Sequence, residues 1–482
     1  MIAMTLPEIA DVVGGAVVHD IGVVVDGAAF VDSRVAERRG LFVAIAGEHV
    51  DGHDYADTAL AGGAAAVLSS RDTGHPGVLV EDPVAALALL ARHSLAALSD
   101  VRVVALTGSQ GKTSTKDVLA HVLAGAGETV ATFGSFNNEL GLPLTVLRAD
   151  PTTRFLVLEM GARHIGDLVA SCAIAPPQVS LVLNVGKAHI GEFGSQQAIA
   201  QAKGEIVEAL GPDGVAVLNA DDPLVTAMAG RTTARVTRFG VHADADVRFE
   251  HVELDGLTRP TFDLVAGAER RTVRLGLLGE HHAANATAAA AVALSLGVPL
   301  DDVVTSLASA TATSPARMQL SERADGVTVV NDAYNANPDS MRAALASLAA
   351  IGRSRPGART VAVLGEMLEL GASSADEHDA VGRLVAGLDI HRLLVVGEGA
   401  QPIHLGARSA GAWGGESAFV PDPDAAFAWL QENLAAGDVV LFKSSKAAQV
   451  RRVAEQVLAD EPHDGTDDGT DGGTDDREEH RR

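Results

Sequence analysis

The sequence is poor in cysteine, in basic residues relative to acidic ones and in long apolar runs. Each scarcity disfavours a cellular location or a class of partner. One cysteine, Cys172, excludes an intramolecular disulfide bond. Lys and Arg number 37 against 63 Asp and Glu, and the formal net charge of -26 disfavours electrostatic binding of nucleic acid or anionic lipid. No apolar run is long enough to cross a bilayer, and no basic segment followed by an apolar core predicts export. We therefore expect a cytoplasmic protein with no nucleic-acid partner and no membrane insertion.

Small aliphatic residues dominate what is present. Hydrophobic residues make up 47% of the chain and aromatic residues 3%, which suits helices packed on buried parallel strands. A chain of 482 residues exceeds what one hydrophobic core usually organises, so two to three domains are expected. Because the net charge is strongly negative, any phosphate-binding site must be local.

Alternating strand and helix patterns divide the chain into three α/β domains. Residues 1–98 form a small α/β domain, and residues 99–312 begin with a strand at 101–107 and continue the alternation. Residues 313–461 restart the pattern and predict a mostly parallel, doubly wound, Rossmann-like sheet. Residues 462–482 are low in complexity and nearly free of apolar side chains, which predicts a disordered acidic tail.

A glycine-rich turn after the strand at 101–107 is typical of phosphate binding. It lies before a helical pattern, where backbone N–H groups and a helix N-terminus cradle phosphates. Lys112 would neutralise phosphate charge, and the Thr113 hydroxyl would bind the nucleotide's magnesium ion. Leu106 stands where the longer motif has its first glycine. The predicted nucleotide-binding residues of this turn are Gly108, Ser109, Gln110, Gly111, Lys112, Thr113 and Ser114. The turn alone leaves a kinase, a GTPase and a ligase open.

Further short motifs follow in a fixed order along nearly the whole chain except the tail. They lie at residues 32–34, 41–48, 51–53, 136–143, 158–161, 184–189, 202–205, 331–338 and 363–371. Together they resemble the motifs of the Mur ligases. Two of them, Asn-Asp-Ala-Tyr-Asn-Ala-Asn-Pro at 331–338 and Val-Leu-Gly-Glu-Met-Leu-Glu-Leu-Gly at 363–371, resemble the members that add D-alanyl-D-alanine rather than one amino acid.

The resemblance implies a three-domain architecture with a central P-loop ATPase-like parallel sheet and a Rossmann-like C-terminal domain that binds the acceptor dipeptide. It also implies ATP-dependent ligation of D-alanyl-D-alanine to UDP-N-acetylmuramoyl-tripeptide through an acyl phosphate, giving the pentapeptide, ADP and phosphate for peptidoglycan synthesis. We expect a monomer. A folate polyglutamate synthase and a nucleotide-binding regulatory protein with a degenerate site are the alternatives, and the third residue of the tripeptide stays open.

The resemblance also implies two magnesium ions, which offset repulsion among the anionic reactants. Glu159 follows an apolar strand at 155–158 and would join Thr113 on the first ion. His189 follows a strand at 179–185 and would bind the second ion. Taken without the motifs, Glu159 reads as a solvated strand end and His189 as a structural histidine.

Lys203 resembles a lysine that the family carbamoylates and uses to bridge to the second ion. A protonated lysine has no lone pair and would repel magnesium, whereas carbon dioxide added to the neutral amine gives a carboxylate-like oxygen ligand. Without the motif, Lys203 is an ordinary exposed lysine on a helix at 195–210. With Lys112, Glu159 and His189 it completes the predicted catalytic set.

Other matched positions imply contacts with the nucleotide. Asn285, at the start of an Ala-rich helix, resembles an adenine-contacting asparagine, and His282 stands where a further asparagine is common. Arg317 and Asp332 would hold the phosphate and the ribose, and by themselves they are surface charges near a linker.

The remaining matches concern the substrates. Ser33 and Arg34, with the loop at 47–53, would hold the UDP end, unless the N-terminal domain is only a folding module. The predicted substrate-binding asparagines are Asn137, Asn138, Asn335 and Asn337. Near the C-terminus, Ser444 and Lys446 depart from a signature that usually reads Lys-Gly-Ser-Arg. A lysine lacks arginine's planar bidentate contact with a carboxylate or phosphate, so we expect acceptor binding there to differ in detail from the family pattern.

Overall fold

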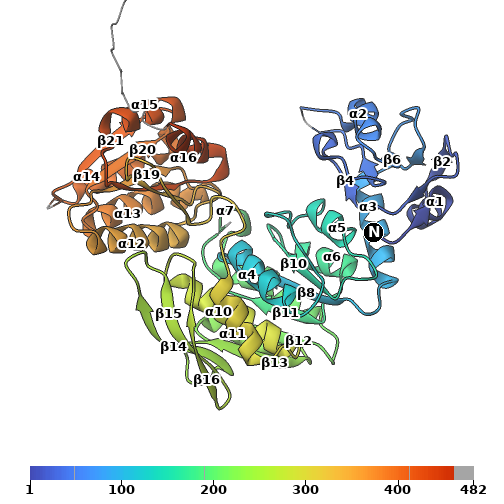
Figure 1. Cartoon of the computed structure of the whole chain (residues 1–482), viewed down its shortest axis with the longest axis horizontal. Coiled ribbons are helices and arrows are strands. Elements are labelled where there is room, and N and C mark those ends of the chain that lie inside the picture. Colours follow the sequence, from blue (N-terminus) through green and yellow to red (C-terminus); the bar gives the residue numbers. More distant parts are fainter. Residues whose placement is uncertain (48, 189, 412, 461–482) are drawn as a thin grey trace, which may run out of the picture.

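The computed structural model describes residues 1–460 except 48, 189 and 412. Three lobes each have their own main sheet, with the N-terminal and C-terminal lobes standing apart on the central lobe (Figure 1). The predicted three-domain α/β architecture is therefore confirmed. His189 and the predicted tail at 462–482 lie outside the described residues.

The N-terminal lobe is a five-stranded sheet with helices packed on it. Its strands lie in the order β2 (Ala16–Val18), β7 (Gly77–Leu79), β6 (Ala66–Ser69), β5 (Leu41–Val43), β4 (Ala29–Phe30), and only the β2–β7 pair is antiparallel. Helix α1 (Leu6–Val13) begins at a Thr5–Glu8 capping box and ends at Gly14, whose φ is 67°. Capping at both ends and apolar residues on one helical face together explain why so short a segment is helical. Two further helices are α2 (Ala56–Ala61) and α3 (Pro83–Ala96).

The central lobe contains nine strands in the order β16-β15-β14-β13-β12-β11-β8-β10-β9. The parallel part comprises β8 (Arg102–Thr107), β9 (Thr129–Ala131), β10 (Phe155–Glu159), β11 (Val179–Val182), β12 (Val215–Asn219), β13 (Arg235–Gly240) and the start of β14 (Val247–Leu254). The expected β/α alternation up to residue 312 is wrong beyond β14. There β14 pairs with β15 (Pro260–Ala266), and β15 with β16 (Glu269–Arg274), as antiparallel neighbours.

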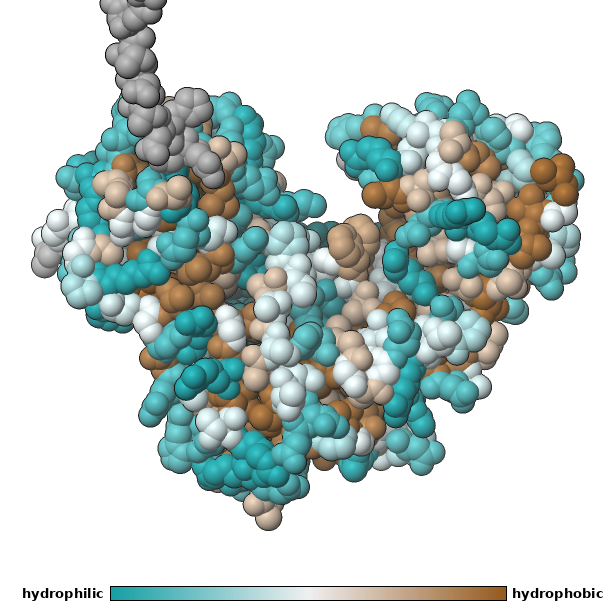
Figure 2. Space-filling view, viewed as in Figure 1, coloured by the Kyte–Doolittle hydropathy of each residue, from teal (hydrophilic) through white to brown (hydrophobic). Residues whose placement is uncertain are grey.

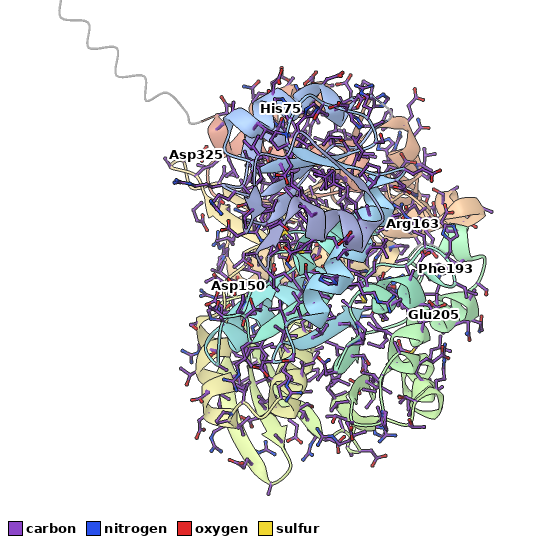
Figure 3. The ribbon with its side chains drawn as sticks, turned by 90° about the vertical axis from the view of Figure 1, so that its right-hand side faces the viewer. His75, Asp150, Arg163, Phe193, Glu205 and Asp325 are labelled. Carbon is purple, nitrogen blue, oxygen red and sulfur yellow. The ribbon has the colours of Figure 1, made fainter. Side chains whose placement is uncertain are left out.

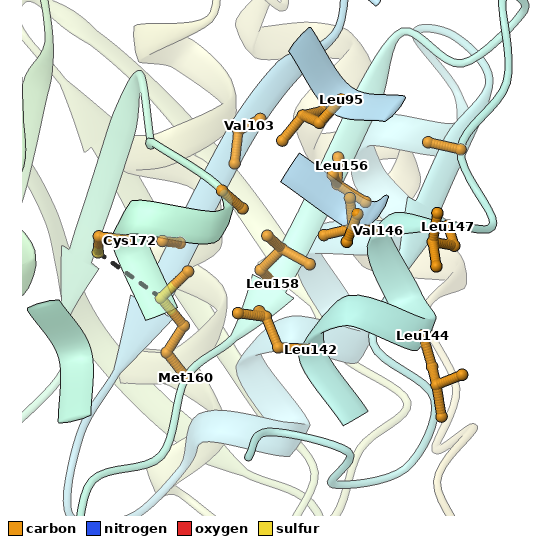
Figure 4. Packing of buried hydrophobic residues seen from close by; sticks show 14 of the residues in the cluster. Leu95, Val103, Leu142, Leu144, Val146, Leu147, Leu156, Leu158, Met160 and Cys172 are labelled. Carbon is orange, nitrogen blue, oxygen red and sulfur yellow. Dashed lines mark hydrogen bonds between the residues drawn. The ribbon is translucent and has the colours of Figure 1, made fainter. Parts of the chain in front are cut away.

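Helices cover both faces of the parallel part, which is why all five residues of β10 are buried. One face packs against α4 (Lys112–Ala124), α10 (His281–Ser295) and α11 (Leu300–Ser309). The other packs against α3, α5 (Gly141–Val146), α6 (Asp167–Ile174) and α8 (Gln196–Glu208). Figure 4 shows this second cluster, where Leu95 of α3 joins Val103 and Leu156 of the central sheet. A continuous apolar core therefore attaches the N-terminal lobe to the central lobe.

The C-terminal lobe has a six-stranded sheet whose strands are all parallel except one. Its order is β17 (Gln319–Glu322), β18 (Thr328–Asn331), β22 (Val439–Lys443), β19 (Thr360–Gly365), β20 (Arg392–Val396), β21 (Glu416–Val420), with β17 antiparallel to β18. Its helices are α12 (Pro338–Ser354), α13 (Ser374–Gly387), α14 (Gln401–Ser409), α15 (Pro423–Asn433) and α16 (Val450–Ala459). They form a separate apolar core on each face of the sheet.

The central and C-terminal lobes meet where central strands end. Lys187, beyond β11, forms an ion pair of 2.6 Å with Glu377 of α13. Helix α7 (Ile190–Phe193) begins here, and a Cβ on Gly191 would lie 2.9 Å from the backbone nitrogen of Gly371. Glycine at position 191 therefore permits the close backbone approach between the lobes. The space-filling view shows an open notch between the two outer lobes, above the central one (Figure 2).

In the part of the chain that the structure describes, no helix combines the length and the apolar character required to span a membrane.

Candidate active site

The predicted phosphate loop connects β8 to α4. Gly111, with a φ of 79°, lies directly before the first residue of α4, and a Cβ there would approach Asn285 Oδ1 to 2.9 Å. Lys112 turns back over the loop and donates a hydrogen bond of 2.7 Å from Nζ to the Gly108 carbonyl. Burial lowers the pKa of Lys112, and the Glu159 carboxylate partly opposes this effect. The ammonium is thus placed at a helix N-terminus, which also favours an anion.

Asn184, just beyond β11, holds the same loop from the side. Its Oδ1 accepts hydrogen bonds of 3.0 Å from the backbone N–H groups of both Ser109 and Gln110. The Ser109 hydroxyl in turn accepts a bond of 2.8 Å from Gly186 N. The sequence motif at 184–189 included Asn184 but gave it no role. Its place immediately after a buried strand was the available signal.

Glu159, at the carboxyl end of β10, is 1% exposed. Its Oε1 accepts a hydrogen bond of 2.6 Å from Asn137 Nδ2, while its Oε2 is buried without a partner among the described residues. A buried carboxylate oxygen without a donor is costly, and a bound cation would remove that cost. The reading of Glu159 as a solvated strand end is therefore wrong.

Thr113, one residue into α4, is linked to the C-terminal lobe through Arg317. Arg317 Nη2 donates a hydrogen bond of 3.2 Å to Thr113 Oγ1, which also lies 3.1 Å from Ser135 Oγ. The guanidinium stacks 4.3 Å from the ring centroid of Tyr334. Arg317 follows the positive-φ residue Ala316, so an unusual local backbone directs this side chain at the loop.

Lys203, in the middle of α8, is 2% exposed, and its ammonium forms no hydrogen bond with any described residue. Burial, and then the nearby Lys112 ammonium, hold the pKa of Lys203 well below that of an exposed lysine. The reading of Lys203 as an ordinary surface lysine is therefore wrong. Arg231 fixes this turn of the helix by donating to the carbonyls of Ala200 and Gln201 at 3.0 and 2.9 Å.

A cavity of about 910 Å³ brings most of the predicted residues together. Those that line it are Ser109, Gln110, Gly111, Lys112, Thr113, Ser114, Asn137, Asn138, Glu159, Lys203, Arg317, Asn335 and Asn337. Arg163, which also lines it, pairs across the lobes with Glu369 at 3.2 Å and is labelled in Figure 3. Residues of the predicted phosphate loop, the Glu159 carboxylate and residues of the C-terminal lobe therefore line the same cavity.

Two of the four asparagines on this wall already serve the backbone. Asn337 caps α12, accepting from Ser340 N at 2.9 Å, and Asn138 Oδ1 accepts from Gly141 N at 3.0 Å. For Asn335, the backbone carbonyl accepts from Lys443 Nζ at 3.2 Å. Local structure alone therefore accounts for the side chains of Asn337 and Asn138.

Several predicted residues do not line this cavity. Gly108 lies within the phosphate loop, and Asn285 lies against Gly111. Asp332 is buried and forms an ion pair of 2.5 Å with Lys443. Sequence analysis had assigned no role to Lys443. The reading of Asp332 as a surface charge is therefore wrong.

Ser33 and Arg34 also lie apart from the cavity, in the N-terminal lobe. Arg34 is exposed and forms a two-pronged ion pair with Asp32, which lowers the pKa of that carboxyl to about 2. Among the described residues, Val31 is the one residue of the N-terminal lobe that lines the cavity. The structure thus leaves the predicted UDP-binding residues beyond the main cavity.

Magnesium is the metal that the predicted chemistry requires. Among the described residues no cluster of three His, Cys, Asp or Glu side chains could hold a metal ion. Glu159 and Thr113 are oxygen donors on the wall of one cavity, and the unpartnered Oε2 of Glu159 fits a hard cation. These residues fit a nucleotide-associated magnesium ion that nucleotide oxygens and water would complete.

Comparison with known proteins places this arrangement in a family. Three family models match the chain: "Mur ligase family, catalytic domain" at residues 13–95, "Mur ligase middle domain" at 106–293, and "Mur ligase, glutamate ligase domain" at 316–446. The chain belongs to the Mur ligase family.

Within that family the chain is similar to the UDP-N-acetylmuramoyl-tripeptide–D-alanyl-D-alanine ligase of Mycobacterium tuberculosis. The two are 47% identical over 96% of this chain and 99% of the relative. The fold is similar to that of MurF from Acinetobacter baumannii, with a TM-score of 0.82, 30% identity and coverage of 95% of this chain and 99% of that one. MurF from Thermotoga maritima in complex with ADP aligns with a TM-score of 0.75 and 32% identity, over 90% of this chain and 97% of that one.

Proposed function

We propose that the protein ligates D-alanyl-D-alanine to UDP-N-acetylmuramoyl-tripeptide at the expense of ATP, in the cytoplasmic stage of peptidoglycan synthesis. The observation that carries the proposal is the shared cavity. The phosphate loop, Glu159, Lys203 and Asn335 of the C-terminal lobe all line it. The relatives named above are ligases of this kind, and one was solved with ADP. Three anionic or polar reactants must be held close together in the right orientation to react, and a cavity lined by more than one lobe can hold them so.

The chemistry follows from the placement of the side chains. Lys112 and the N-terminus of α4 bind nucleotide phosphates and stabilise charge as the γ-phosphoryl group moves to the peptide carboxylate. The dipeptide amine then attacks the acyl phosphate, the amide bond forms, and phosphate leaves. Arg317 reaches the loop from the C-terminal lobe, so it favours the arrangement in which water is excluded from the acyl phosphate.

Two magnesium ions belong to this proposal. Thr113 and Glu159 would hold one, and His189 and a carbamoylated Lys203 the other; when bound, the ions offset repulsion among the anionic groups. Carbamoylation is supported by the buried, unpaired state of Lys203 and its lowered pKa. The neutral amine attacks carbon dioxide, a nitrogen–carbon bond forms, and the amine's proton is lost to solvent. Lys203 thereby changes from a potential cation to an oxygen ligand.

The lobes divide the reactants in this proposal. Residues 1–98, with Ser33 and Arg34, hold the UDP end; residues 99–312 hold ATP, with Asn285 at adenine and Asp332 at the ribose. Residues 313–461 hold the dipeptide, and the protein acts as a monomer. The peptide substrates would lie against the part of the cavity wall that carries Asn137, Asn138, Asn335 and Asn337.

Phosphate release measured with each substrate omitted in turn tests the proposal. Full release is expected only with ATP, the muramoyl tripeptide and the dipeptide together, and a pentapeptide product should form. Glutamate-dependent turnover of a folate would support the polyglutamate synthase instead, and it would contradict our proposal. Nucleotide binding without turnover would indicate a regulatory protein.

A further inference from the structure

An ion pair between the central and C-terminal lobes lies where two cavities share part of their walls. Arg163 Nη2 donates a hydrogen bond of 3.2 Å to Glu369 Oε1, and the two side chains are 66% and 32% exposed. Both residues line a second cavity, of about 580 Å³, and Arg163 also lines the first cavity. Among the described residues, Arg163 is the one arginine that lines both. A ligand at this junction therefore meets a cation and an anion side by side.

The fold holds the backbone beneath each of these side chains in place. In the central lobe, Asp167 Oδ2 accepts hydrogen bonds of 2.8 Å from the backbone N–H groups of Arg163 and His164. In the C-terminal lobe, Glu369 has a left-handed φ of 63°, and its carbonyl accepts from Gly191 N at 3.1 Å. A left-handed backbone is uncommon for a residue other than glycine and persists where the surrounding structure requires it. Only the flexible ends of the two side chains therefore need to move when a ligand binds.

The proposed function, on which the following inference rests, brings one part of the tripeptide to this ion pair. The carboxylate that becomes the acyl phosphate belongs to the third residue of the tripeptide, and it must lie beside Lys112. Lys112 and Arg163 line both cavities together. A long side chain extends about 6 Å from its Cα. The side chain of the third residue can therefore reach Arg163 and Glu369 while its main-chain carboxylate stays at the phosphate loop.

The two charges decide which side chain fits. The ammonium of a lysine side chain would compete with Arg163 for Glu369 and leave the guanidinium without its present partner. A side chain that ends in both an amine and a carboxylate can offer the amine to Glu369 and the carboxylate to Arg163. One ion pair is then replaced by two, and the arginine can bind the carboxylate through two parallel hydrogen bonds. The pair therefore favours a zwitterionic side chain over a cationic one.

We propose that Arg163 and Glu369 together read the side chain of the third residue of the tripeptide. They select a diamino acid with a second carboxylate, such as diaminopimelate, over lysine. Arg163 binds the side-chain carboxylate, and Glu369 binds the side-chain ammonium. Lys112 serves the main-chain carboxylate and the phosphoryl group, so changes at Arg163 should alter the choice of tripeptide rather than the use of ATP.

The test compares three UDP-muramoyl tripeptides. One ends in meso-diaminopimelate, the second in the same residue with its side-chain carboxylate amidated, and the third in L-lysine. The wild type should use the acid with a kcat/KM about tenfold to a hundredfold higher than the amide or the lysine form, as expected for hydrogen bonds to a charged group. In Arg163→Ala the acid and the amide should be used nearly equally, with the KM values for ATP and D-alanyl-D-alanine nearly unchanged.

Three further variants sharpen the test. Arg163→Glu should prefer the lysine form to the acid, because two carboxylates then face the side chain. Glu369→Gln should lower kcat/KM for the lysine form, whose ammonium loses its counter-charge. Arg451→Ala, which removes an exposed cation from α16 and touches neither cavity, is the matched control and should keep the wild-type preference.

Three outcomes would overturn the inference. The first is an unchanged preference for the acid in an Arg163→Ala protein with a normal melting temperature, because the side-chain carboxylate would then bind elsewhere. The second is an equal loss for all three tripeptides together with a raised KM for D-alanyl-D-alanine, which would assign the guanidinium to the dipeptide. The third is equal use of acid and amide by the wild type, which would leave the proposed function standing. Failure of the wild type to use any of the three tripeptides would instead contradict the proposed function itself.

Discussion

Asn137 donates a hydrogen bond of 2.6 Å from Nδ2 to Oε1 of Glu159, while Oε2 of the same carboxylate is buried without a partner among the described residues. The amide fixes one oxygen and leaves the other for a cation on the cavity wall. Twenty-two residues separate the pair in the chain, and β9 and β10 bring them together.

Asn137→Ala should therefore raise the magnesium concentration required for half-maximal phosphate release. The loss in metal affinity or activity should be on the order of tenfold to a hundredfold, as for other residues that orient a metal ligand. Titration of phosphate release with magnesium measures it. Asn433→Ala, at an amide that lines neither cavity, is the control; an equal shift in both variants would show a general effect of losing an amide.

Lys112→Ala should reduce turnover by at least about a hundredfold, because it removes a charge aimed at the transferring phosphoryl group. The melting temperature should stay the same or rise, since the substitution relieves the cost of burying an ammonium whose pKa is lowered. Steady-state kinetics and thermal unfolding of the same preparation check both. Near-normal turnover in a folded variant would contradict a role for Lys112 in phosphoryl transfer.

Lys203→Ala should lose most activity and regain part of it with added small carboxylates such as acetate. The carboxylate would replace the oxygen ligand that a carbamoylated lysine supplies. Lys203→Arg should not be rescued, because a guanidinium keeps its charge and fills the space. Rescue is measured as phosphate release with and without the carboxylate at fixed ionic strength. Wild-type activity in the alanine variant would contradict this role.

His282 should make the fold less stable in acid. The imidazole is buried, its Nδ1 has no partner among the described residues, and burial followed by His281 lowers its pKa well below 6.5. As the pH falls through about 6.5, the imidazole of His282 therefore binds a proton in the unfolded chain but stays neutral in the folded chain. Stability is lost as pH falls below that value, by up to about 1.4 kcal/mol per pH unit for one group.

His282→Asn, which introduces the residue common at this position, should lose less melting temperature than the wild type between pH 7.5 and pH 5.5. Thermal unfolding of both proteins at the two pH values measures the difference, and titrations common to both cancel. Parallel losses in the two proteins would show that His282 does not carry the pH dependence.

The sequence predicted what depends on local pattern and on motif. The predicted phosphate loop could be located because Gly111 and Lys112 stand where the turn after β8 passes into α4. The three-lobed α/β fold was also predictable. The antiparallel strands β14 to β16 were missed, although polar Thr261 and Asp263 alternate with apolar Phe262 and Leu264 along β15, which is the signature of a strand with one covered face.

Contacts between distant segments could not be predicted, because they depend on how whole lobes pack. Arg317 and Thr113 are 204 residues apart, and Lys443 and Asp332 are 111 apart. The burial of Lys203 is similar, because helical periodicity cannot show which neighbouring elements cover a lysine. These residues acquire their chemistry only when the lobes are assembled.

The most direct test of the central claim is the fate of carboxylate oxygen. Tripeptide labelled with ¹⁸O in its terminal carboxylate is incubated with ATP and D-alanyl-D-alanine, and the released phosphate is analysed by mass spectrometry. Formation of an acyl phosphate predicts that each phosphate carries one ¹⁸O and that the new amide keeps the other. Unlabelled phosphate released alongside the pentapeptide product would contradict the account.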